Sequence, residues 1–388
     1  MLDRDLVERE YGYLGEDIYL NIASVAMPPA RVRDVCRNFL DDYVSTFCRK
    51  IFDDFGSMRR RAGEKLSKLI NAAPEEITFV KNTTEGNSIL ACGYELAVGG
   101  NVVVCDLEHP SNLFPWINAQ RRGIKVKSIA TRHGEIPAES VIAAMDGDTR
   151  VVALSAVQYG TGYFSDLKMI GEACRRRKVV FAVDAIQGLG RLKIDVNEFC
   201  IDYLSCGGFK GLLGTLGAGF VYCDSGLIRS IVPPYAGYQS TTGHAEPPAV
   251  TRDFENLPWH DDVRRLEAGG QNTYGIMAMD KGVELILELG IDEIESHIRG
   301  LEAYMRERIT DLPRLKILRP ADPARWSGIV CVLFPEHAFD AARGIMEKHK
   351  IHATLRKGYL RLSIGFYNSR EQMEIVTQAL MELSVRCN

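Results

Sequence analysis

Short apolar runs alternate with amphipathic segments through the first part of the chain, up to about residue 225. Strands that alternate with helices indicate crossover connections and a largely parallel sheet. Several of the apolar runs have no polar alternation, which is expected when helices cover both faces of a sheet. The predicted strands are 77–80, 101–107, 125–130, 150–157, 179–185, 202–206 and 217–223, and the predicted helices are 59–72, 85–97, 138–145 and 167–177.

The pattern changes after residue 225. Residues 226–265 are irregular and rich in proline, glycine and polar side chains, which predicts a long loop of the kind that is often functional. Helical and strand patterns then return, so that a smaller α+β domain is expected at the C-terminal end. Its predicted helices are 273–290, 291–312, 338–348 and 370–385, and its predicted strands are 328–334 and 359–365.

The composition is that of an ordinary globular protein, with 46% hydrophobic and 25% charged residues in a chain of 388. A net charge of -4 gives no reason to expect nucleic acid or an anionic membrane as a partner. The first residues, MLDRDLVEREYG, are charged throughout and do not resemble a signal peptide. No apolar run reaches the roughly 18 residues of a membrane span. We therefore expect a cytoplasmic protein that does not enter a membrane.

The cysteines and histidines do not form metal-binding patterns. The ten cysteines lack C-x-x-C pairs, and most lie in apolar runs such as VVVCDL and GIVCVLF, which favours buried, reduced thiols. The eight histidines show no spacing such as H-x3-H. No metal site is expected.

Polar residues follow several of the predicted strands, where ligands of open α/β sheets gather. Thr83 and Thr84 precede a helix, whose N-terminus is suited to phosphate, although a simple helix cap is the alternative. His109 is placed to stack on a flat ring or to move protons, but a loop histidine is more often only exposed. Gln158 ends a further strand.

Two more strands end at ionisable residues. Asp184 and Gln187 lie in FAVDAIQG, where a carboxylate either caps the next turn or holds a cationic ring nitrogen. Lys210 lies in SCGGFKGLLG, among small and aromatic neighbours. A lysine in a dry pocket has a lowered pKa and can form a Schiff base, whereas a lysine that reaches solvent is the alternative.

The order of these residues indicates a cofactor. Hydroxyls for a phosphate, a histidine facing a ring, a strand-end aspartate and then a lysine are what pyridoxal phosphate requires. A Walker loop is excluded because no Gly-Lys-Ser/Thr occurs in this region. A dinucleotide site is not supported, because GTLGAG at 214–219 opens a strand rather than a helix.

Six motifs, in this order, resemble the class V aminotransferase family of pyridoxal-phosphate enzymes, in the branch with cysteine desulfurases, cysteine C–S lyases and isopenicillin N epimerase-like proteins. They are TTEGN, LEHPSNLFPW, VDAIQG, GGFKGLLG, LEAGGQNTYG and RLSIGFYN. The resemblance implies fold type I, with a large domain built on a mainly parallel seven-stranded sheet and a smaller C-terminal α+β domain. It implies domains at 26–265 and 266–388, with an N-terminal segment, 1–25, packed against the small domain.

The resemblance also implies which residues hold the cofactor. Lys210 would form the Schiff base, Asp184 would pair with the ring nitrogen, and His109 would stack on the ring; these are the expected catalytic residues. Gln187 would touch the phenolic oxygen of the ring, and Thr84 would bind the phosphate. The remaining expected cofactor-binding residues are Thr83, Gln158, Asn272 and Thr273.

Substrate and assembly follow from the same resemblance. Asn272 and Thr273 match a segment that reaches the phosphate of a neighbouring protomer, which implies a homodimer with shared active sites. Arg361 would grip the substrate carboxylate, because a bidentate fork suits that task better than a lysine does. The substrate side would be lined by Asn21, Ala23 and Ser24.

The chain departs from the family pattern at two places. Many relatives have a histidine and a serine where this chain has Phe209 and Gly207, and a threonine where it has Gly270. Desulfurases carry a nucleophilic cysteine on a loop before the carboxylate arginine, but no cysteine occurs between Phe339 and Arg361. The nearest one, Cys331, lies in an apolar strand, where an inert thiol is expected.

The resulting hypothesis is a pyridoxal-phosphate enzyme that acts at Cα of a small amino acid. The favoured reaction is β-elimination of the C–S lyase type. Lys210 would abstract the Cα proton, and loss of the β-substituent needs no cysteine nucleophile. Transamination and epimerisation are the alternatives within the family. A catalytically silent binding protein on the same fold is the alternative of another class. A nucleotide-binding oxidoreductase would require nicotinamide binding, which the sequence does not predict.

Overall fold

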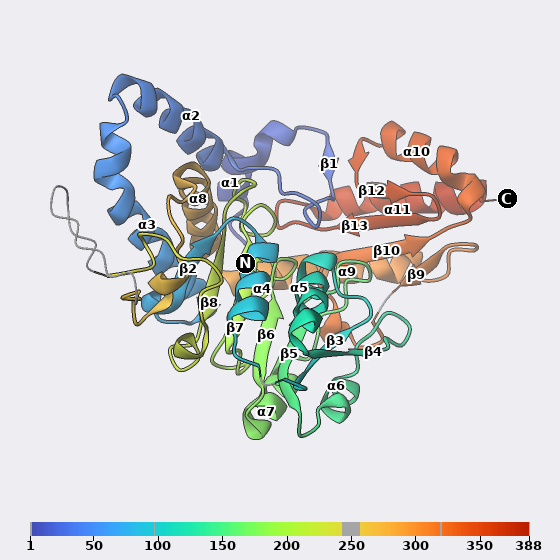
Figure 1. Ribbon diagram of the computed structural model, residues 1–388. Coiled ribbons are helices and arrows are strands. Elements are labelled where there is room, and N and C mark those ends of the chain that lie inside the picture. The colour runs from blue at the N-terminus through green and yellow to red at the C-terminus, as the bar shows by residue number, and fades with distance from the viewer. Residues whose placement is uncertain (1, 97, 243–256, 319, 388) are drawn as a thin grey trace.

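The computed structural model describes residues 2–387 except 97, 243–256 and 319. The strands of its larger sheet are β2 (Ile77–Val80), β3 (Asn101–Cys105), β4 (Lys125–Ile129), β5 (Thr149–Ser155), β6 (Val180–Asp184), β7 (Tyr203–Gly207) and β8 (Gly219–Cys223). These seven strands lie in the order β2-β8-β7-β6-β5-β3-β4 (Figure 1). β8 is antiparallel to both of its neighbours, and the other pairs are parallel. The predicted mainly parallel sheet is confirmed.

Helices cover both faces of this sheet, which explains why its strands lack polar alternation. Val102 lies in the core beneath α4 (Thr83–Gly93) and α5 (Pro110–Ala119). Its neighbour Val103 points the other way, into the core beneath α7 (Leu167–Arg177). Successive side chains of a strand point to opposite faces, so a strand between two helical layers must be apolar at every position.

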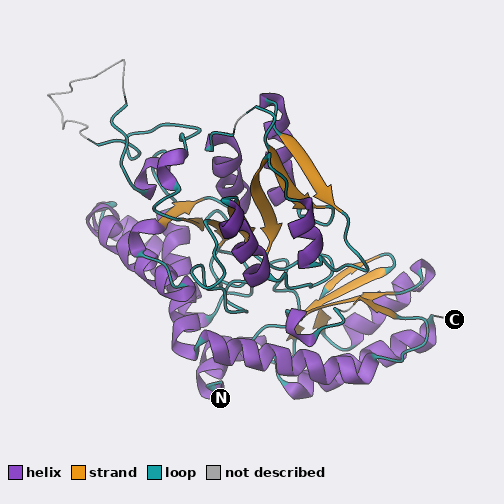
Figure 2. Ribbon diagram, turned by 90° about the horizontal axis from the view of Figure 1, so that it is seen from below, coloured by secondary structure: helices purple, strands orange, loops and turns teal. Residues whose placement is uncertain are grey.

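The smaller domain is built on a four-stranded antiparallel sheet, in the order β12-β13-β10-β9. Figure 2 shows this sheet apart from the larger one. The strands are β9 (Lys316–Leu318), β10 (Ile329–Leu333), β12 (Thr354–Arg356) and β13 (Tyr359–Ser363), and the helices are α9 (Ile291–Ile309), α10 (Phe339–Lys348) and α11 (Arg370–Arg386). The predicted combination of a parallel sheet with a C-terminal α+β domain is therefore confirmed.

The N-terminal segment lies against the smaller domain. Its strand β1 (Ile18–Tyr19) pairs in parallel with β11 (Ile351–His352). Arg4, in α1 (Arg4–Tyr11), donates hydrogen bonds to the carbonyl oxygens of Phe366 and Asn368. These contacts bring the first strand of the chain beside its last hairpin. The domain boundaries at 25 and 265 stay a prediction.

Several helices differ from the sequence-based expectation. α2 (Ala30–Ser45) was not predicted, although Val32, Cys36, Phe39 and Tyr43 recur in it at helical spacing; Val32 is the one residue of the helix that is buried. α3 (Arg49–Ile70) begins well before the predicted start at residue 59. α5 was missed because it contains two prolines, one of which occupies the first turn, where its missing N–H costs nothing. The predicted 273–290 helix is α8 (Thr273–Leu289).

Part of the predicted 226–265 loop, residues 243–256, lies outside the described residues. The described part contains short 3₁₀ turns at Ile228–Ser230 and Val263–Leu266.

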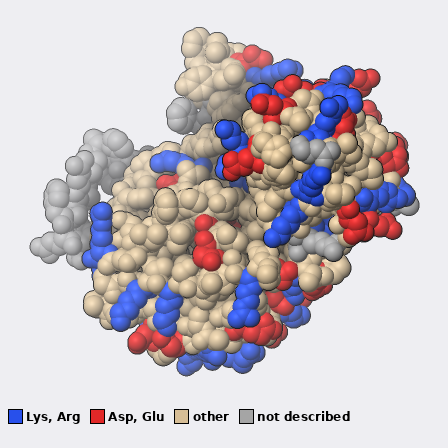
Figure 3. All heavy atoms as spheres, turned by 90° about the vertical axis from the view of Figure 1, so that its right-hand side faces the viewer, with Lys and Arg blue, Asp and Glu red and all other residues tan. Residues whose placement is uncertain are grey.

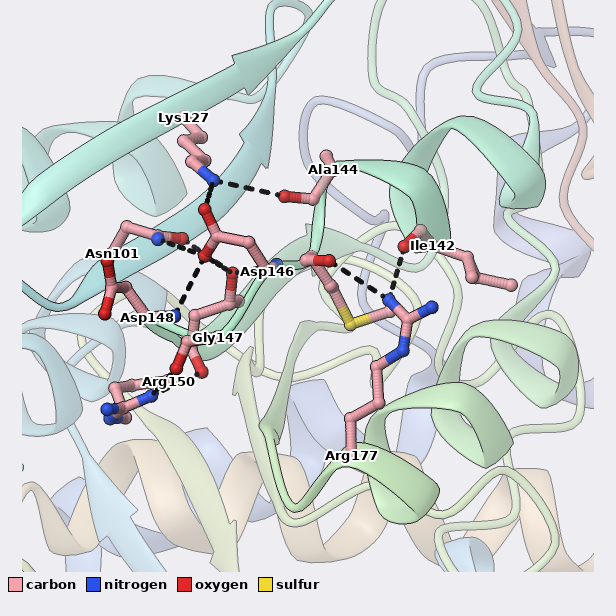
Figure 4. Close-up of polar contacts among 11 residues, drawn as sticks. Asn101, Lys127, Ile142, Ala144, Asp146, Gly147, Asp148, Arg150 and Arg177 are labelled. Carbon is pink, nitrogen blue, oxygen red and sulfur yellow. Dashed lines mark hydrogen bonds and ion pairs between the residues drawn. The ribbon is translucent and has the colours of Figure 1, made fainter.

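A closed cluster of polar groups surrounds Asp146 at the amino end of the larger sheet (Figure 4). Its Oδ1 accepts hydrogen bonds from Asn101 Nδ2 at 2.8 Å and from the backbone amide of Asp148 at 3.0 Å. Its Oδ2 pairs with Lys127. Thr149 Oγ1 lies 3.0 Å from Asp146 Oδ1 and 2.8 Å from Asn101 Oδ1. The Lys127 ammonium and these donors hold the pKa of Asp146 well below its ordinary range.

The surface carries charges of both signs. On the face seen in Figure 3, lysines and arginines are interspersed with aspartates and glutamates rather than gathered in one field. Over the described part of the chain, none of the helices is both long enough and apolar enough to cross a membrane.

Candidate active site

A cavity of about 840 Å³ opens where several strands of the larger sheet end. Its walls come from residues that follow β2, β3, β5, β6 and β7 and from the hairpin of β12 and β13 opposite them. The size is that of a site for a small ligand. Residues from both domains therefore meet in one cavity. Its lining includes the predicted site residues Ala23, Ser24, Thr83, Thr84, His109, Gln187, Lys210 and Arg361.

Lys210 follows β7 and has its ammonium group inside this cavity. Burial lowers the pKa of Lys210 to about 8, and the guanidinium of Arg361 adds to this effect, while the carboxylate of Asp184 opposes it. The nearest aromatic ring is that of Phe209, whose centroid lies 5.6 Å from Nζ. An amine with this pKa is partly uncharged near neutral pH and can act as a nucleophile or as a base.

Asp184 is the last residue of β6 and is 2% exposed. Its Oδ1 accepts one hydrogen bond, from the backbone amide of Ile186 at 3.1 Å, and no cation pairs with it among the described residues. Burial raises the pKa of Asp184 to about 7, with a smaller contribution from the nearby carboxylate of Glu108. A buried carboxyl group without a partner is costly, unless a ligand brings the missing cation.

His109 caps the N-terminus of α5. The backbone amide of Ser111 donates to His109 Nδ1 at 3.1 Å, so a neutral ring carries its proton on Nε2. Burial lowers the pKa of His109, and the cations of Lys210 and Arg361 lower it further. The ring of Tyr159 stands edge-on at 5.0 Å between centroids. The contacts therefore fix a neutral, flat ring at the cavity wall.

The N-terminus of α4 forms another part of the wall. Thr84 is exposed to the cavity, whereas Thr83 Oγ1 accepts a hydrogen bond from the backbone amide of Gly207 at 2.9 Å. A side chain at position 207 would have its Cβ only 3.0 Å from Ile186 and 3.3 Å from Thr83 Oγ1. The departure at Gly207 thus has a steric reason, since the threonine hydroxyl and Ile186 occupy the place of a side chain there.

Arg361 projects from β13 into the cavity with little exposure of its own. Its guanidinium donates to the backbone oxygen of Tyr159 at 3.0 Å, to Ser24 Oγ at 2.7 Å and to Thr354 Oγ1 at 3.2 Å. Asn21 does not line the cavity, but its Oδ1 accepts a hydrogen bond from Thr354 at 2.7 Å. Arg361 is thus held by neutral groups, and no carboxylate among the residues that the structure describes pairs with it.

Besides Asn21, the predicted site residues that do not line this cavity are Asp184, Gln158, Asn272 and Thr273. Gln158 is fully buried behind the cavity, where its Nε2 donates to Glu108 Oε1 at 3.0 Å. Asn272 caps α8 and lines a neighbouring cavity of about 770 Å³, and Thr273 is the first residue of that helix. The two cavities share Asn82 and Gly217 in their walls.

Two buried charged residues that the sequence did not single out support the site. Glu108 accepts hydrogen bonds from Asn112 Nδ2 at 2.8 Å and from the Ser155 amide at 2.9 Å. Arg191 donates to the backbone oxygens of Gln187, Ser327 and Ile364, which joins the two domains behind the cavity. Glu108 lies next to His109 in the motif LEHPSNLFPW, but the motif does not show that its side chain is buried, and Arg191 lies outside the six motifs.

These groups fit pyridoxal phosphate. A desolvated amine and a neutral histidine line one cavity, beside a helix N-terminus that suits a phosphate, and the buried carboxyl of Asp184, which interacts electrostatically with Lys210, has no cation paired with it among the described residues. Gln187 Oε1 also lacks a partner there, while its Nε2 donates to the backbone oxygen of Ala23 at 2.9 Å. No cluster of three or more potential metal ligands occurs within the described ranges.

Comparisons with known proteins agree on one family. A family model described as aminotransferase class-V matches residues 18–376. The chain is 28% identical over 402 aligned positions to a probable cysteine desulfurase of Methanothermobacter thermautotrophicus, with 97% of each chain covered. It is 27% identical over 388 positions to a cysteine desulfurase of Yersinia pestis, with 94% of this chain and 93% of the relative covered.

Solved structures share the fold. An apo cysteine desulfurase from Thermococcus onnurineus superposes with a TM-score of 0.84 at 22% identity, covering 99% of this chain and 98% of that one. A cystine C–S lyase in complex with its product cysteine persulfide superposes with a TM-score of 0.86 at 20% identity, covering 96% and 99%.

Proposed function

The chain belongs to the aminotransferase class-V family, and from that premise we propose that it is a pyridoxal-phosphate enzyme whose reaction is β-elimination from a sulfur amino acid. It is cysteine desulfurase-like in sequence over nearly its whole length. Elimination differs from desulfuration in its sulfur acceptor. A desulfurase passes sulfur to a cysteine thiol, whereas elimination only requires that the bond between Cβ and sulfur break.

The cavity residues provide what the elimination needs. Pyridoxal phosphate, when bound, supplies a ring that accepts the electron pair released at Cα. Lys210 has the pKa of a usable base near neutral pH and removes the Cα proton. Arg361 binds the substrate carboxylate through its guanidinium charge. Asp184, whose buried carboxyl has no cation partner among the described residues, would pair with the cationic ring nitrogen of the cofactor. His109 offers a neutral ring for stacking.

The positions of the cysteine thiols favour elimination over desulfuration. All ten cysteines lie in the described part of the chain, and none of them lines the cavity. Cys331 is the nearest cysteine before Arg361 in the chain and faces it across the strand pair β10 and β13, yet it is 0% exposed. Burial raises the pKa of Cys331 to about 11, and its sulfur lies 3.2 Å from Tyr359 Oη. Such a thiol is not a nucleophile.

Proton NMR of the holoenzyme in D2O, with L-cysteine and L-cystine as substrates, tests this proposal. Pyruvate and ammonia are the expected products, and Lys210→Ala should form neither. Alanine with released sulfur would instead establish desulfuration, as the names of the relatives suggest. Cys331→Ser is the matched variant, and it should leave pyruvate formation unchanged. Deuterium at Cα without net product would favour epimerisation or a transamination half-reaction.

We also propose that two copies of the chain share their active sites. Support comes from Asn272, which lines the neighbouring cavity rather than the cavity of Lys210, and Thr273 follows it as the first residue of α8. Sedimentation of the holoenzyme should give a dimer. Asn272→Ala should weaken cofactor binding, and a stable monomer with full activity would contradict the proposal.

A further inference from the structure

We propose that Glu108 is a positioning residue of the cofactor site: it is the permanently charged member of a buried carboxyl pair and keeps the other member, Asp184, protonated until a cationic ring binds. Glu108 does not line the cavity, so it acts through Asp184. The inference rests on the pyridoxal phosphate of the proposed function and not on the elimination reaction.

The two carboxyl groups are brought together through Ser155. Asp184 ends β6, and its register partner on the neighbouring strand β5 is Ser155. The backbone amide and the hydroxyl of Ser155 both donate to Glu108, at 2.9 Å and 2.5 Å. Glu108 and Asp184 are 4% and 2% exposed, and neither forms an ion pair among the residues that the structure describes. Two buried carboxyl groups this close cannot both be charged at low cost.

Hydrogen bonds decide which of the two groups keeps the charge. Glu108 Oε1 accepts from Cys105 Sγ at 3.4 Å and from Gln158 Nε2 at 3.0 Å, in addition to the Ser155 amide. Its Oε2 accepts from Asn112 Nδ2 at 2.8 Å and from the Ser155 hydroxyl. Three of these five donors are N–H groups, which cannot accept a proton in return. Such an environment favours the charged form of Glu108.

Asp184 lies in the opposite environment. It accepts one hydrogen bond, from a backbone amide. Its register partners on both neighbouring strands are serines, Ser155 on β5 and Ser205 on β7. Their hydroxyls donate to Glu108 and to Asn87 rather than to Asp184. The proton of the carboxyl pair therefore belongs to Asp184.

The charges around Asp184 agree with this assignment. Burial raises the pKa of Asp184 to about 7, with a smaller contribution from Glu108, and the ammonium of Lys210 opposes the effect. The thiol of Cys206 also interacts with Asp184, but burial raises the pKa of Cys206, so that it stays uncharged. Near neutral pH the carboxyl pair of the cofactor-free protein thus carries its full charge on Glu108 and a shared, partial charge on Asp184.

The proton has a defined destination when the cofactor binds. A protonated pyridine nitrogen beside Asp184 favours the carboxylate, so the O–H bond of Asp184 breaks and its proton passes to water. A ring that arrives unprotonated takes the proton of Asp184 instead. In both cases one O–H bond breaks, one proton moves, and no oxidant or reductant is needed. The charge of Glu108 adds to the field that holds the ring nitrogen protonated.

Infrared difference spectroscopy tests the proposal on the full chain freed of cofactor. The probe is 4′-deoxypyridoxine 5′-phosphate, which has the ring and the phosphate but no aldehyde, so that Lys210 forms no bond to it. Binding of the probe should remove the C=O stretching band of one protonated carboxyl group. The loss should be nearly complete at pH 6, about half at pH 7 and about a tenth at pH 8, because it follows the pKa of Asp184. No loss at pH 6 would overturn the proposal.

Variants assign the band. Glu108→Gln should move the pH of half-maximal loss downward by about one unit, because a like charge near Asp184 is removed. Glu108→Asp, which keeps the charge, should restore part of that shift. Asp184→Asn should abolish the band change, and adding Glu108→Gln to it should change nothing more. A band that persists in Asp184→Asn would place the proton on Glu108 and overturn the proposal, whether or not Glu108→Gln folds.

The control is Asp106→Asn, which removes an exposed carboxylate two residues before Glu108. The side chain of Asp106 accepts a hydrogen bond from the backbone amide of Thr131, and water screens its charge. This variant should leave the pH of half-maximal loss unchanged. A merely structural role for Glu108 would lower the stability of Glu108→Gln without moving that pH, which would also overturn the proposal.

The probe separates failure of this inference from failure of the proposed function, because it undergoes no elimination. The expected band loss in a holoenzyme that forms no pyruvate would refute only the elimination. A probe that binds without the band loss would refute only the role of the carboxyl pair. A probe that does not bind at all would refute the cofactor site, and this inference with it.

Discussion

The amino and carboxyl ends of the larger sheet use polar side chains in opposite ways. Around Asp146, at the amino end, the charged and polar groups meet partners within the chain: Lys127 pairs with the carboxylate, and Asn101 and Thr149 bond to it and to each other (Figure 4). At the carboxyl end, Asp184 accepts one backbone hydrogen bond and has no cation.

The pKa values of the two regions follow the same division. The pKa of Asp146 is held low by its partners, whereas burial raises the pKa of Asp184 to about 7 and lowers that of Lys210 to about 8. Polar groups that hydrogen-bond or ion-pair with one another stabilise a fold, whereas buried polar groups without such partners in the chain are candidates for binding a ligand. The comparison teaches that polar residues at a strand end indicate function only where the chain itself does not satisfy them.

Lys210→Ala should give the largest effect. We expect pyruvate formation to fall by about a thousandfold or more, because the variant loses the base. Stability should not fall, since folding places this amine where its charge is disfavoured, as its lowered pKa shows. Activity assays and urea unfolding check the two parts. Lys193→Ala, at an exposed ion pair with Asp292, should leave activity intact. A large loss of stability in Lys210→Ala would show that Lys210 has a structural role, like the groups around Asp146.

Asp184→Asn should change how stability depends on pH. The folded-state pKa of Asp184, about 7, lies above the ordinary value of about 3.9, so between them the folded protein holds a proton that the unfolded chain has lost. Its contribution therefore makes the cofactor-free protein less stable as pH rises through this window, by at most about 1.4 kcal/mol per pH unit. Urea unfolding of both proteins at pH 5, 6 and 7 should show the wild-type stability falling relative to that of the variant as pH rises, with the curve of the variant flatter. Parallel curves would contradict the prediction.

Thr149→Val should act on stability and not on activity. Thr149 is buried, and its hydroxyl bonds to Asn101 Oδ1 and accepts from the backbone amide of Asp146 at 2.9 Å. Valine keeps the shape but leaves these groups unsatisfied, at a cost of about 1–3 kcal/mol. Urea unfolding measures the loss. Thr131→Val, whose hydroxyl lies outside the cluster, should stay within about 0.5 kcal/mol. A loss of activity at unchanged stability would contradict the conclusion that the amino end of the larger sheet is structural and the carboxyl end functional.

Lys127→Met should have the smallest effect. The ion pair with Asp146 is exposed, and such pairs contribute little and are screened by salt. We expect a loss of stability smaller than that of Thr149→Val, which disappears in about 1 M salt. Unfolding at low and high salt provides the measurement. A loss that persists at high salt would show that the lysine acts through packing or through its contact with the backbone oxygen of Ala144.

The sequence predicted what local patterns can encode. The seven strands of the larger sheet lie within or beside the predicted runs, because β-branched residues without polar alternation suit a buried strand. The sequence-based prediction missed α2, although Val32, Cys36 and Phe39 recur in it at helical spacing. It placed Gln158 among the cofactor-binding residues, whereas the structure turns this side chain toward Glu108. A strand-end position does not tell which way a side chain points once the strand has ended.

By itself, the sequence determined the class of fold, the family and the residue types of the site, because motifs and periodicity are local properties of a chain. Tertiary structure decided the rest. Only the sheet order places β8 between β2 and β7, and only the register of β12 and β13 sets Arg356 beside Arg361 at the cavity. Burial, which depends on neighbours from distant segments, raises the pKa values of Asp184 and Cys331 and lowers that of Lys210. Charges and pKa values belong to the assembled environment, and a linear sequence does not contain that environment.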